Sequence, residues 1–599
     1  MCGIAGFVNL DGAPPAAGVL EAMTDMVRHR GPDDRGTLCL SLRGGAPDTA
    51  LGVQRLAILD RSTRAHQPMT SPDGSVALLF NGAVYDAFGV RAELERDGYR
   101  FRTSTDTEVV LALYERLGLE RMLPRLDGMF AVVIADTRRG VVHLLRDRIG
   151  IKPLYWVQCG QALLFASESK AFLAHPAFRA EIDPAQVDEL IAFRYLAGEA
   201  TPLRGVRQVR PGHCLSIAAG GVSDTCYWRI PDFIEKPRLS LEDAVDRLDH
   251  LLGRSVRAQS RSDVNLGCQL SGGVDSSLVT LRARSERADV NAFSIVFNEP
   301  RFSEERWIQA ASATAGVTSH RFVFDEAGFM GALDAASWHM DQPIGHPNSL
   351  ALWVLAARSR EHATVLLTGE GADELFGGYA RITAAGSDTR PPGVHDPVDT
   401  FIRATAFHSE ARLARLRPDA DLRPAIEKRR AVFHEGRSDH VSNCLRYDMR
   451  THLVDLLLRQ DKTTMAHGVE SRVPFLDRHI VDFARALPSE HLVGKVVAKE
   501  LARRSFGEAF AYRRKSAFNL PLAQYFRSAA FVTLMEDRLL PGMRSRGLVD
   551  VSVVRRWWRR ALKAPSTTEA FWGVVALELW AQQFVDGRRA TTWAAHEMP

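Results

Sequence analysis

The sequence predicts two domains of mixed α and β structure, the second of them a doubly wound α/β domain with additional helices toward its C-terminal end. Three observations lead to this prediction. Residues 3–8 (GIAGFV) are small and apolar, which is typical of a buried strand. Residues 264–285 and 364–379 each read as a strand, a glycine-rich loop and a helix. Between these patterns, residues 218–240 are rich in Gly, Pro and Ser, which indicates a domain boundary.

Composition excludes several functional classes. The 599 residues hold 76 basic and 72 acidic side chains, so the net charge of +4 indicates no nucleic-acid partner. We expect the basic run at 555–560 (RRWWRR) to turn its tryptophans inward and its arginines to solvent. Seven cysteines without a CxxC pair fit a reducing compartment, so we expect a cytoplasmic protein. The sequence contains no run of 18 apolar residues, so we expect no membrane-spanning helix.

Cys2 is the first candidate catalytic residue. If Met1 is removed, Cys2 carries both a thiol and a free α-amine. An α-amine titrates near pH ~7.7–8.0 and a thiol near ~8.5, so part of the amine can accept the thiol's proton at neutral pH. This pairing is a known way to activate an N-terminal nucleophile. The alternative is an ordinary cysteine near a frayed chain end.

The motifs that follow Cys2 strengthen the catalytic interpretation. They are RHRGPDDRG (28–36), QRLAILD (54–60), FNGAVYD (80–86), TDTEVVLALY (105–114), LDGMFAVVIAD (126–136) and RDRIGIKPLYW (146–156). In this order the set resembles the glutamine-hydrolysing domain of class II amidotransferases over residues 2–217. The resemblance implies an N-terminal-nucleophile fold, an α+β four-layer αββα sandwich. It also implies glutamine as the nitrogen donor.

The resemblance assigns roles to five residues. Cys2 attacks the side-chain amide of glutamine, and Asn81 and Gly82, expected in a turn after VALLF, stabilise the oxyanion. Arg55 binds the α-carboxylate of glutamine and Asp106 binds its α-amine. Taken singly, these residues also fit a surface charge, a hairpin turn and a helix N-cap.

One position departs from the family. Its common motif NGEIYN is NGAVYD here, so Ala83 replaces a glutamate that helps to hold the α-amine of glutamine. We hypothesise that glutamine binds more weakly, or that a somewhat different donor is accepted.

The second domain, predicted over 234–599, begins with a helix and a phosphate-binding loop. Apolar residues at helical spacing over 241–256 predict the helix. The strand at 264–270 then leads into SGGVDSS (271–277) and a second helix. Glycines let backbone N–H groups face an anion, and the helix N-terminus adds its dipole. The loop lacks the Lys of a Walker motif.

This loop resembles the pyrophosphate loop of adenylate-forming ATP pyrophosphatases. The resemblance implies ATP and Mg²⁺, with Asp275 and Asp373 as the magnesium carboxylates. It also implies an adenine nucleotide hydrolase-like fold. The residues that it assigns to ATP are Leu270, Ser271, Gly272, Gly273, Asp275, Ser276, Ser277, Ile295, Thr368 and Gly369.

Further motifs extend the likeness to almost the whole chain. TGEGADELFGGY (368–379), RQDKTTMAHGVESRVPFLD (459–477), KVVAKELARR (495–504) and RRKSAFNLPL (513–522) resemble glutamine-hydrolysing asparagine synthetases. The resemblance implies that Glu370 acts as base on the incoming amine. It places Lys499 where a lysine stabilises the charge of pyrophosphate and of the tetrahedral intermediate. Ala517 replaces a glycine of the last motif.

The implied reaction joins two half-reactions. Cys2 releases ammonia from glutamine, and an internal passage carries it to a carboxylic acid activated as an adenylate. The products are an amide, AMP and pyrophosphate, with aspartate as the default acceptor. Two alternatives stay open: another carboxylic acid or nitrogen donor in specialised metabolism, and a glutaminase or regulatory homologue without synthetase activity. The resemblance also allows a homodimer.

Overall fold

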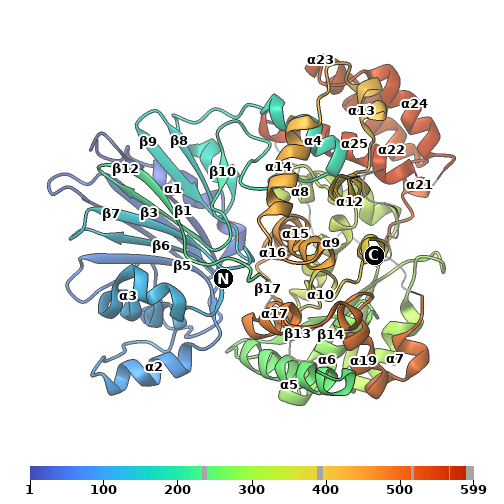
Figure 1. The fold of residues 1–599 in the computed structure, drawn as a ribbon. Helices are drawn as coiled ribbons and strands as arrows, with labels where there is room; N and C mark the ends of the chain where they lie inside the picture. Colours follow the sequence, from blue (N-terminus) through green and yellow to red (C-terminus); the bar gives the residue numbers. More distant parts are fainter. Residues whose placement is uncertain (233–238, 387–395, 515–517, 565–566, 589–599) are drawn as a thin grey trace.

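Two domains lie side by side in the computed structural model (Figure 1), which describes residues 1–232, 239–386, 396–514, 518–564 and 567–588. The first domain, in blue and teal, contains two antiparallel sheets of six strands each. One sheet has the order β10-β8-β9-β1-β3-β2: Arg207–Gln208, Tyr155–Cys159, Ala162–Ala166, Cys2–Asn9, Thr49–Arg55 and Asp34–Leu40. The other has the order β12-β11-β7-β6-β5-β4: Gly221–Cys226, His213–Ala218, Val141–Arg146, Gly128–Asp136, Val76–Val84 and Met69–Thr70.

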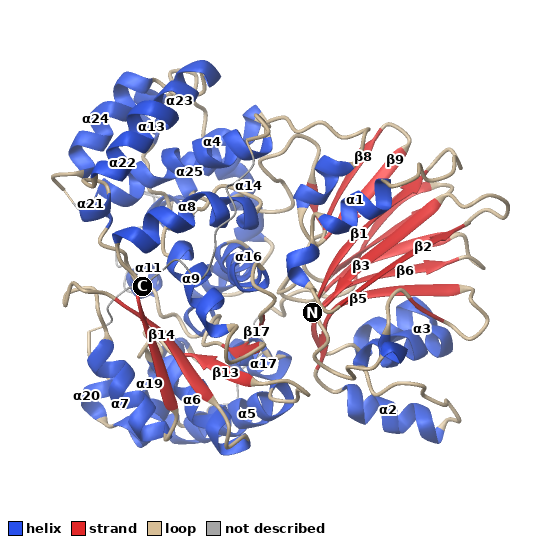
Figure 2. Cartoon of the chain, turned by 180° about the vertical axis from the view of Figure 1, so that it is seen from behind, coloured by secondary structure: helices blue, strands red, loops and turns tan. Residues whose placement is uncertain are grey.

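The sheets stack face to face, and helices cover their outer faces, as Figure 2 shows from behind. Helix α1 (Val19–Asp25) packs on the β1 sheet, while α2 (Ala87–Arg96) and α3 (Asp106–Met122) cover the β5 sheet. The predicted four-layer αββα sandwich is therefore confirmed.

Strand β1 explains how this sandwich buries the chain's first residues. Cys2, Ile4 and Val8 point into the core between the two sheets, whereas Ala5 and Phe7 point toward the α1 layer. Successive side chains of a strand face opposite sides, so a strand covered on both faces must be apolar throughout. This explains why residues 3–8 carry no polar position.

The first domain extends past its predicted end at residue 217. Strand β12 pairs with β11 from Ala218↔Gly221 to His213↔Cys226 and completes the second sheet. The Gly- and Ser-containing stretch that we interpreted as the start of a linker is therefore a tight hairpin and an edge strand. The boundary lies after Cys226.

The second domain contains a parallel sheet of five strands in the order β15-β14-β13-β16-β17. These strands are Thr318–Val323, Asn291–Val296, Leu266–Gln269, Val365–Leu367 and Glu470–Arg472. The strand order reverses at β13, whose neighbours β14 and β16 lie on its two sides. Ligands of doubly wound sheets bind at the carboxyl ends of strands at such a switch point. The loops after β13 and β16 both lie there.

Helices cover both faces of this sheet, which confirms the doubly wound class (Figures 1 and 2). On one side lie α5 (Leu241–Gln259), α6 (Val274–Glu286), α7 (Glu305–Ala315) and α19 (Val496–Phe506). On the other lie α8 (Glu326–Met340), α9 (Ser349–Ser359) and α16 (His452–Met465). The remaining longer helices are α4 (Pro184–Phe193), α12 (Pro397–Ala404), α14 (Arg423–His434), α15 (His440–Arg450), α17 (Arg478–Arg485), α24 (Val551–Ala561) and α25 (Thr568–Phe584).

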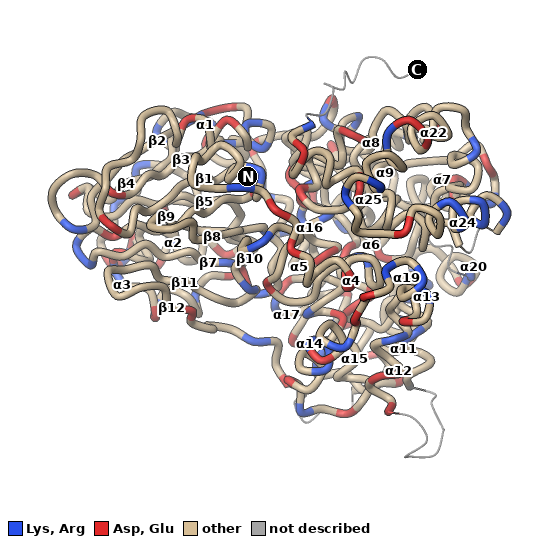
Figure 3. Tube along the Cα trace, turned by 90° about the horizontal axis from the view of Figure 1, so that it is seen from above, with Lys and Arg blue, Asp and Glu red and all other residues tan. Residues whose placement is uncertain are grey.

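The C-terminal helices follow the sequence-based expectations. In α24 Trp557 and Trp558 are buried and Arg559 and Arg560 are exposed, so the basic run is the solvated face of a packed helix. Figure 3 shows both signs of charge interspersed over the two domains. Within the described residues no helix is long and apolar enough to span a membrane. Most of the loop that we expected at 384–396, and the Gly-to-Ala change at position 517, lie outside the described residues.

Candidate active sites

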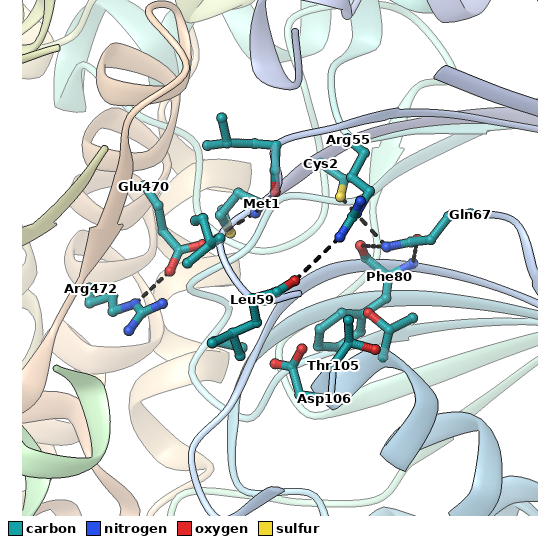
Figure 4. Close-up of a pocket in the computed structure, with 15 residues that line it drawn as sticks. Met1, Cys2, Arg55, Leu59, Gln67, Phe80, Thr105, Asp106, Glu470 and Arg472 are labelled. Carbon is teal, nitrogen blue, oxygen red and sulfur yellow. Dashed lines mark hydrogen bonds and ion pairs between the residues drawn. The ribbon is translucent and has the colours of Figure 1, made fainter. Parts of the chain in front are cut away.

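The first site is a small cavity around Cys2, shown in Figure 4. Its volume is about 30 Å³, and Cys2 at the start of β1 is only 3% exposed. Cys2 pairs with Arg55 of β3 in the sheet register, which brings two predicted site residues together. The lining residues include Met1, Cys2, Arg55, Gln67, Gly82, Ala83, Asp106, Glu470 and Arg472.

The backbone of Cys2 is held from both sides. Its N–H donates to Oδ1 of Asn81 at 3.0 Å, and Nε of Arg30 donates to its carbonyl oxygen at 3.2 Å. Nε2 of Gln67 lies 3.8 Å from Sγ. Burial raises the pKa of the Cys2 thiol, although the N-terminal ammonium and Arg55 oppose the shift. The thiol therefore needs a base before it can attack.

Met1 occupies the cavity beside Cys2 (Figure 4). Its ammonium donates to the carbonyl of Leu56 at 3.2 Å and pairs with Oε2 of Glu470 at 3.3 Å. With Met1 in place, the nitrogen of Cys2 is a peptide nitrogen and cannot act as a base. The chemistry that we predicted for Cys2 thus depends on removal of Met1.

Asn81 and Gly82 lie inside strand β5, not in the turn that we expected after VALLF. The turn prediction is wrong because the apolar run continues as a ladder with β6, in which Asn81 faces Ala131 and Gly82 faces Phe130. Among the described residues, Nδ2 of Asn81 is buried without a hydrogen-bond partner. A donor with no partner beside a nucleophile is suited to an oxyanion.

Arg55 and Asp106 lie on the cavity wall, as predicted. Arg55 donates to the carbonyl of Asp60 at 2.6 Å, and its side chain is almost fully buried. Asp106 is the first residue of α3, whose N-cap is Thr105, so the N-cap alternative for Asp106 is wrong. Oδ2 of Asp106 accepts the N–H of Val84 at 3.0 Å, and burial raises its pKa to about 6.

Two lining residues that we did not predict come from the other domain. Glu470 and Arg472 belong to β17, and Nε of Arg472 donates to Oε1 of Glu470 at 2.5 Å. Burial opposes ionisation of Glu470, but Arg472, the N-terminal ammonium and Lys152 together lower its pKa. The only sequence signal for this contact was the likeness of 459–477 to a segment near the inter-domain passage.

A buried ionic cluster joins the domains next to this cavity. Arg30 donates to Glu168 at 2.9 Å and to Asp461 of α16 at 2.8 Å, and Lys152 reaches Asp461 at 3.2 Å. All four side chains are at most 1% exposed. The sequence showed no pattern for it, because the partners lie more than a hundred residues apart.

The second site is a cavity of about 600 Å³ at the switch point of the parallel sheet. It brings together most residues predicted for ATP, metal and catalysis. Those on its wall are Leu270, Ser271, Gly273, Asp275, Ser276, Ile295, Thr368, Gly369, Glu370, Asp373 and Lys499.

Two predicted ATP-binding residues, Gly272 and Ser277, are not on the cavity wall. Ser277 is fully buried, because neighbouring residues of α6 point in different directions and only Ser276 turns toward the loop. Gly272 has a φ of +79°, which a glycine adopts without strain, and contributes to the loop through its backbone. The structure therefore does not bring the Ser277 side chain to the cavity wall, and its role in ATP binding stays a prediction.

The loop after β13 has the form of an anion cradle. The N–H of Ser271 donates to Oγ of Ser276 at 3.2 Å, which folds the loop over the start of α6. Gly273 caps this 13-residue helix. The first residues of α6 line the cavity, so the N-terminal end of its dipole lies there, an arrangement that favours phosphate.

Asp275 and Asp373 converge on one cation, the ammonium of Lys495. Its Nζ lies 2.5 Å from Asp275 and 2.8 Å from Asp373. Oδ1 of Asp275 has no hydrogen-bond partner among the described residues. The carboxylates of Asp275 and Asp373 are therefore suited to bind Mg²⁺, whose other ligands would be phosphate oxygens and water.

Lys495 was missed in the sequence, where Lys499 was chosen from the same motif. Both line the cavity: Lys495 is the N-cap of α19, Lys499 lies in its first turn, and the N–H of Lys499 donates to the carbonyl of Lys495 at 2.8 Å. Nζ of Lys499 lies 5.8 Å from the ring centre of Tyr512. The sequence offered no signal that separates the two lysines, because Lys495 lies just before the helix with a φ of +62°.

Comparison with known proteins assigns a family to each domain. The asparagine synthase family matches residues 247–582 and the glutamine amidotransferase domain family matches residues 1–228. Glutamine-hydrolysing asparagine synthetase 1 of Bacillus subtilis is 30% identical over 572 residues, 88% of each chain. Asparagine synthetase 3 of the same organism is 28% identical over 86% of this chain and 87% of its own. Amidase chry2 of Gibberella zeae is 27% identical over 82% and 83%.

The fold, the buried Cys2 and the phosphate loop together define a glutamine amidotransferase joined to a synthetase domain. The chain belongs to the asparagine synthase family, and it is an enzyme of the glutamine-hydrolysing asparagine synthetase type.

Proposed function

We propose that this enzyme hydrolyses glutamine at Cys2 and transfers the ammonia to an adenylated carboxylic acid, with release of AMP and pyrophosphate. The proposal rests on the presence of both sites in one chain. One cavity holds the buried Cys2 and Nδ2 of Asn81, which has no hydrogen-bond partner among the described residues. The other holds the loop of residues 271–276 together with Asp373. Seven free cysteines are in keeping with action in the cytoplasm.

The first half-reaction is nucleophilic catalysis at Cys2. The α-amine of Cys2, once Met1 is removed, takes the thiol proton, and Sγ attacks the side-chain amide carbon of glutamine. Nδ2 of Asn81 and the N–H of Gly82 stabilise the oxyanion. Collapse of the tetrahedral intermediate expels ammonia and leaves a γ-glutamyl thioester, which water hydrolyses to glutamate.

Glutamine is held by opposite charges in the same cavity. Arg55 binds its α-carboxylate and Asp106 its α-ammonium. Ala83 leaves one carboxylate fewer for that ammonium, so we propose weak glutamine binding. Ala83→Glu should then lower the KM for glutamine. An unchanged KM for glutamine would refute the hypothesis of weak binding. A lower KM for another nitrogen donor would instead support the hypothesis of a different donor.

The second half-reaction takes place at the switch point. An oxygen of the acceptor carboxylate attacks the α-phosphorus of ATP, and pyrophosphate leaves into the loop of residues 271–276. Mg²⁺, held by Asp275 and Asp373, would neutralise phosphate charge there. Lys495 and Lys499 face the same charge. Glu370 takes a proton from the incoming ammonia as its nitrogen attacks the acyl carbon and AMP departs.

Aspartate is the first acceptor to test, because the bacterial relatives are named asparagine synthetases. A second acceptor class is also favoured, since the fungal relative of similar coverage is named an amidase. ATP–pyrophosphate exchange separates the candidates. Exchange only with aspartate supports asparagine synthesis, and exchange with another acid assigns that acid. No exchange with any acid would leave only a glutaminase or regulatory protein.

A further inference from the structure

The cavity around Cys2 holds an ammonium group on acceptors from both domains (Figure 4). The α-ammonium of Met1 donates to the carbonyl oxygen of Leu56 at 3.2 Å and pairs with Oε2 of Glu470 at 3.3 Å. Leu56 lies in the first domain, whereas Glu470 is the first residue of β17 in the second. Neither partner of the ion pair is more than 1% exposed, so water screens their attraction little. The cavity wall therefore provides a buried binding place for an ammonium group.

Removal of Met1 takes that ammonium away and creates an α-amine beside its place. The nitrogen of Cys2 becomes this amine, and in the structure it already donates to Oδ1 of Asn81 at 3.0 Å. Consecutive backbone nitrogens lie about 3–4 Å apart, so the new amine lies within about 7 Å of Oε2 of Glu470. Rotation about the side-chain bonds of the glutamate can bring that oxygen into hydrogen-bond distance.

Glu470 keeps its charge and one carboxylate oxygen for this amine. Nε of Arg472 donates to Oε1 at 2.5 Å, whereas Oε2 faces Met1. Burial opposes ionisation of Glu470, but Arg472, the N-terminal ammonium and Lys152 together lower its pKa. Arg472 and Lys152 stay in place when Met1 is removed. A buried oxygen that has lost its donor then gains free energy from a new N–H partner.

Other charged side chains also act on the amine. Those that line or border the cavity are Arg30, Arg55, Asp106, Lys152 and Arg472. The four cations disfavour a proton on the amine, and Asp106 favours it. Nε of Arg30 is held by the carbonyl of Cys2, and Oδ2 of Asp106 by the N–H of Val84. Glu470 is thus the carboxylate that already contacts an ammonium in this cavity.

We propose that Glu470 is a positioning residue for glutamine hydrolysis, whose Oε2 accepts one N–H of the mature Cys2 α-amine while Oδ1 of Asn81 accepts the other. The lone pair of the amine is then free to take the proton of Sγ, which gives a thiolate and an ammonium. The carboxylate of Glu470 balances the charge of that ammonium. The inference rests on the proposed function, because it adds a residue of the second domain to the base of the same reaction.

The pH dependence of glutamine hydrolysis tests the role of this carboxylate. A negative charge beside the thiol and the amine makes the pair release its proton at higher pH. Glu470→Gln keeps an acceptor oxygen but removes the charge. We therefore expect the acid limb of kcat/KM that belongs to the amine, ordinarily near pH ~8, to move to lower pH by about 1 pH unit. The plateau at high pH should stay within about threefold, because Gln still accepts a hydrogen bond.

Three further variants separate charge from general damage. Glu470→Ala should show the same displacement and lose at least about tenfold of the plateau, because the acceptor is gone as well. Arg472→Gln should move the limb to higher pH, because the charge of Glu470 is then unopposed. Glu470→Asp keeps the charge beside Arg472 and should leave the limb near its native position. Glu305→Gln, at an exposed pair with Arg321, is the matched control.

The rate at which iodoacetamide alkylates Cys2, followed by mass spectrometry over the same pH range, should show the same displacements without turnover. Amide formation from ammonium salts reports whether the second domain is intact, and intact mass reports the removal of Met1. An amine limb that stays in place in Glu470→Gln and Glu470→Ala, in enzyme that still hydrolyses glutamine, would overturn the inference and leave the proposed function standing. Glutamine hydrolysis by a chain that retains Met1 would refute both.

Discussion

Nη2 of Arg30 donates to Oδ2 of Asp461 at 2.8 Å, and this buried contact joins the two domains. Arg30 also holds the carbonyl of Cys2, while Asp461 lies on α16, the helix that carries Arg459 beside Glu370. Arg30 therefore contacts the first site, and the helix that it binds lines the second. Removal of the Asp461 charge leaves Arg30 and Lys152 buried without this shared counter-ion.

Asp461→Asn should lower the free energy of unfolding by about 3–5 kcal/mol, because breaking a buried ion pair leaves charge uncompensated. Urea unfolding of the full chain measures this loss. Glu305→Gln, which breaks the exposed pair with Arg321, is the control and should cost at most about 1 kcal/mol. Equal effects of the two variants would show that the inter-domain cluster contributes little.

Cys2→Ser should abolish amide formation from glutamine but leave amide formation from ammonium salts within about twofold, because the second site lies in the other domain. Both rates are followed as AMP release with each nitrogen source. If the variant also lost the ammonia-dependent reaction, the assignment of glutamine hydrolysis and amide formation to two separate cavities would be wrong.

Asn81→Ala should lower kcat for glutamine hydrolysis about 10²- to 10³-fold, the usual effect of removing one oxyanion donor. The KM for glutamine should change little, because the amide acts on charge that develops only in the transition state. Glutamate production at saturating glutamine measures the effect. A rise in KM with an unchanged kcat would instead assign Asn81 to substrate binding.

Glutamine use should depend on the ionisation of Asp106, whose pKa burial raises to about 6. The ionised carboxylate binds the ammonium of glutamine, so kcat/KM for glutamine should show an acid limb as pH falls through about 6, in addition to the fall that protonation of the Cys2 α-amine causes below pH ~8. Asp106→Asn should lower kcat/KM about 10- to 100-fold and remove this acid limb. The same limb in the variant would assign the titration to another group.

Local patterns predicted the elements that hold the chemistry. The apolar residues at the start of the chain form β1, and residues 264–285 form β13, the phosphate loop and α6. Cys2 and Asp275 line the two cavities. These features depend on alternation and on glycine positions within a few residues, which a single chain displays. The resemblance supplied the first domain's layers, which alternation alone does not determine.

Contacts between distant segments could not be predicted in this way. Glu470 reaches the Cys2 cavity because β17 is the edge strand next to the first domain, and no local pattern encodes that neighbour. Asn81 was placed in a turn because Asn-Gly favours turns, but pairing with β6 overrode this preference. Lys495 reaches the aspartates from the N-cap position before α19, where its φ is +62°, and the motif alone did not show that the helix begins after it.

In the proposed reaction, nitrogen from glutamine displaces AMP from an adenylated carboxylate. The most direct test uses the accepted acid with ¹⁸O in its carboxylate, together with ATP and glutamine labelled with ¹⁵N in the amide. We expect ¹⁵N in the amide product and one ¹⁸O in AMP for each amide formed, because the acid loses that oxygen to the phosphate. AMP without ¹⁸O, or ¹⁸O in inorganic phosphate with release of ADP, would contradict it.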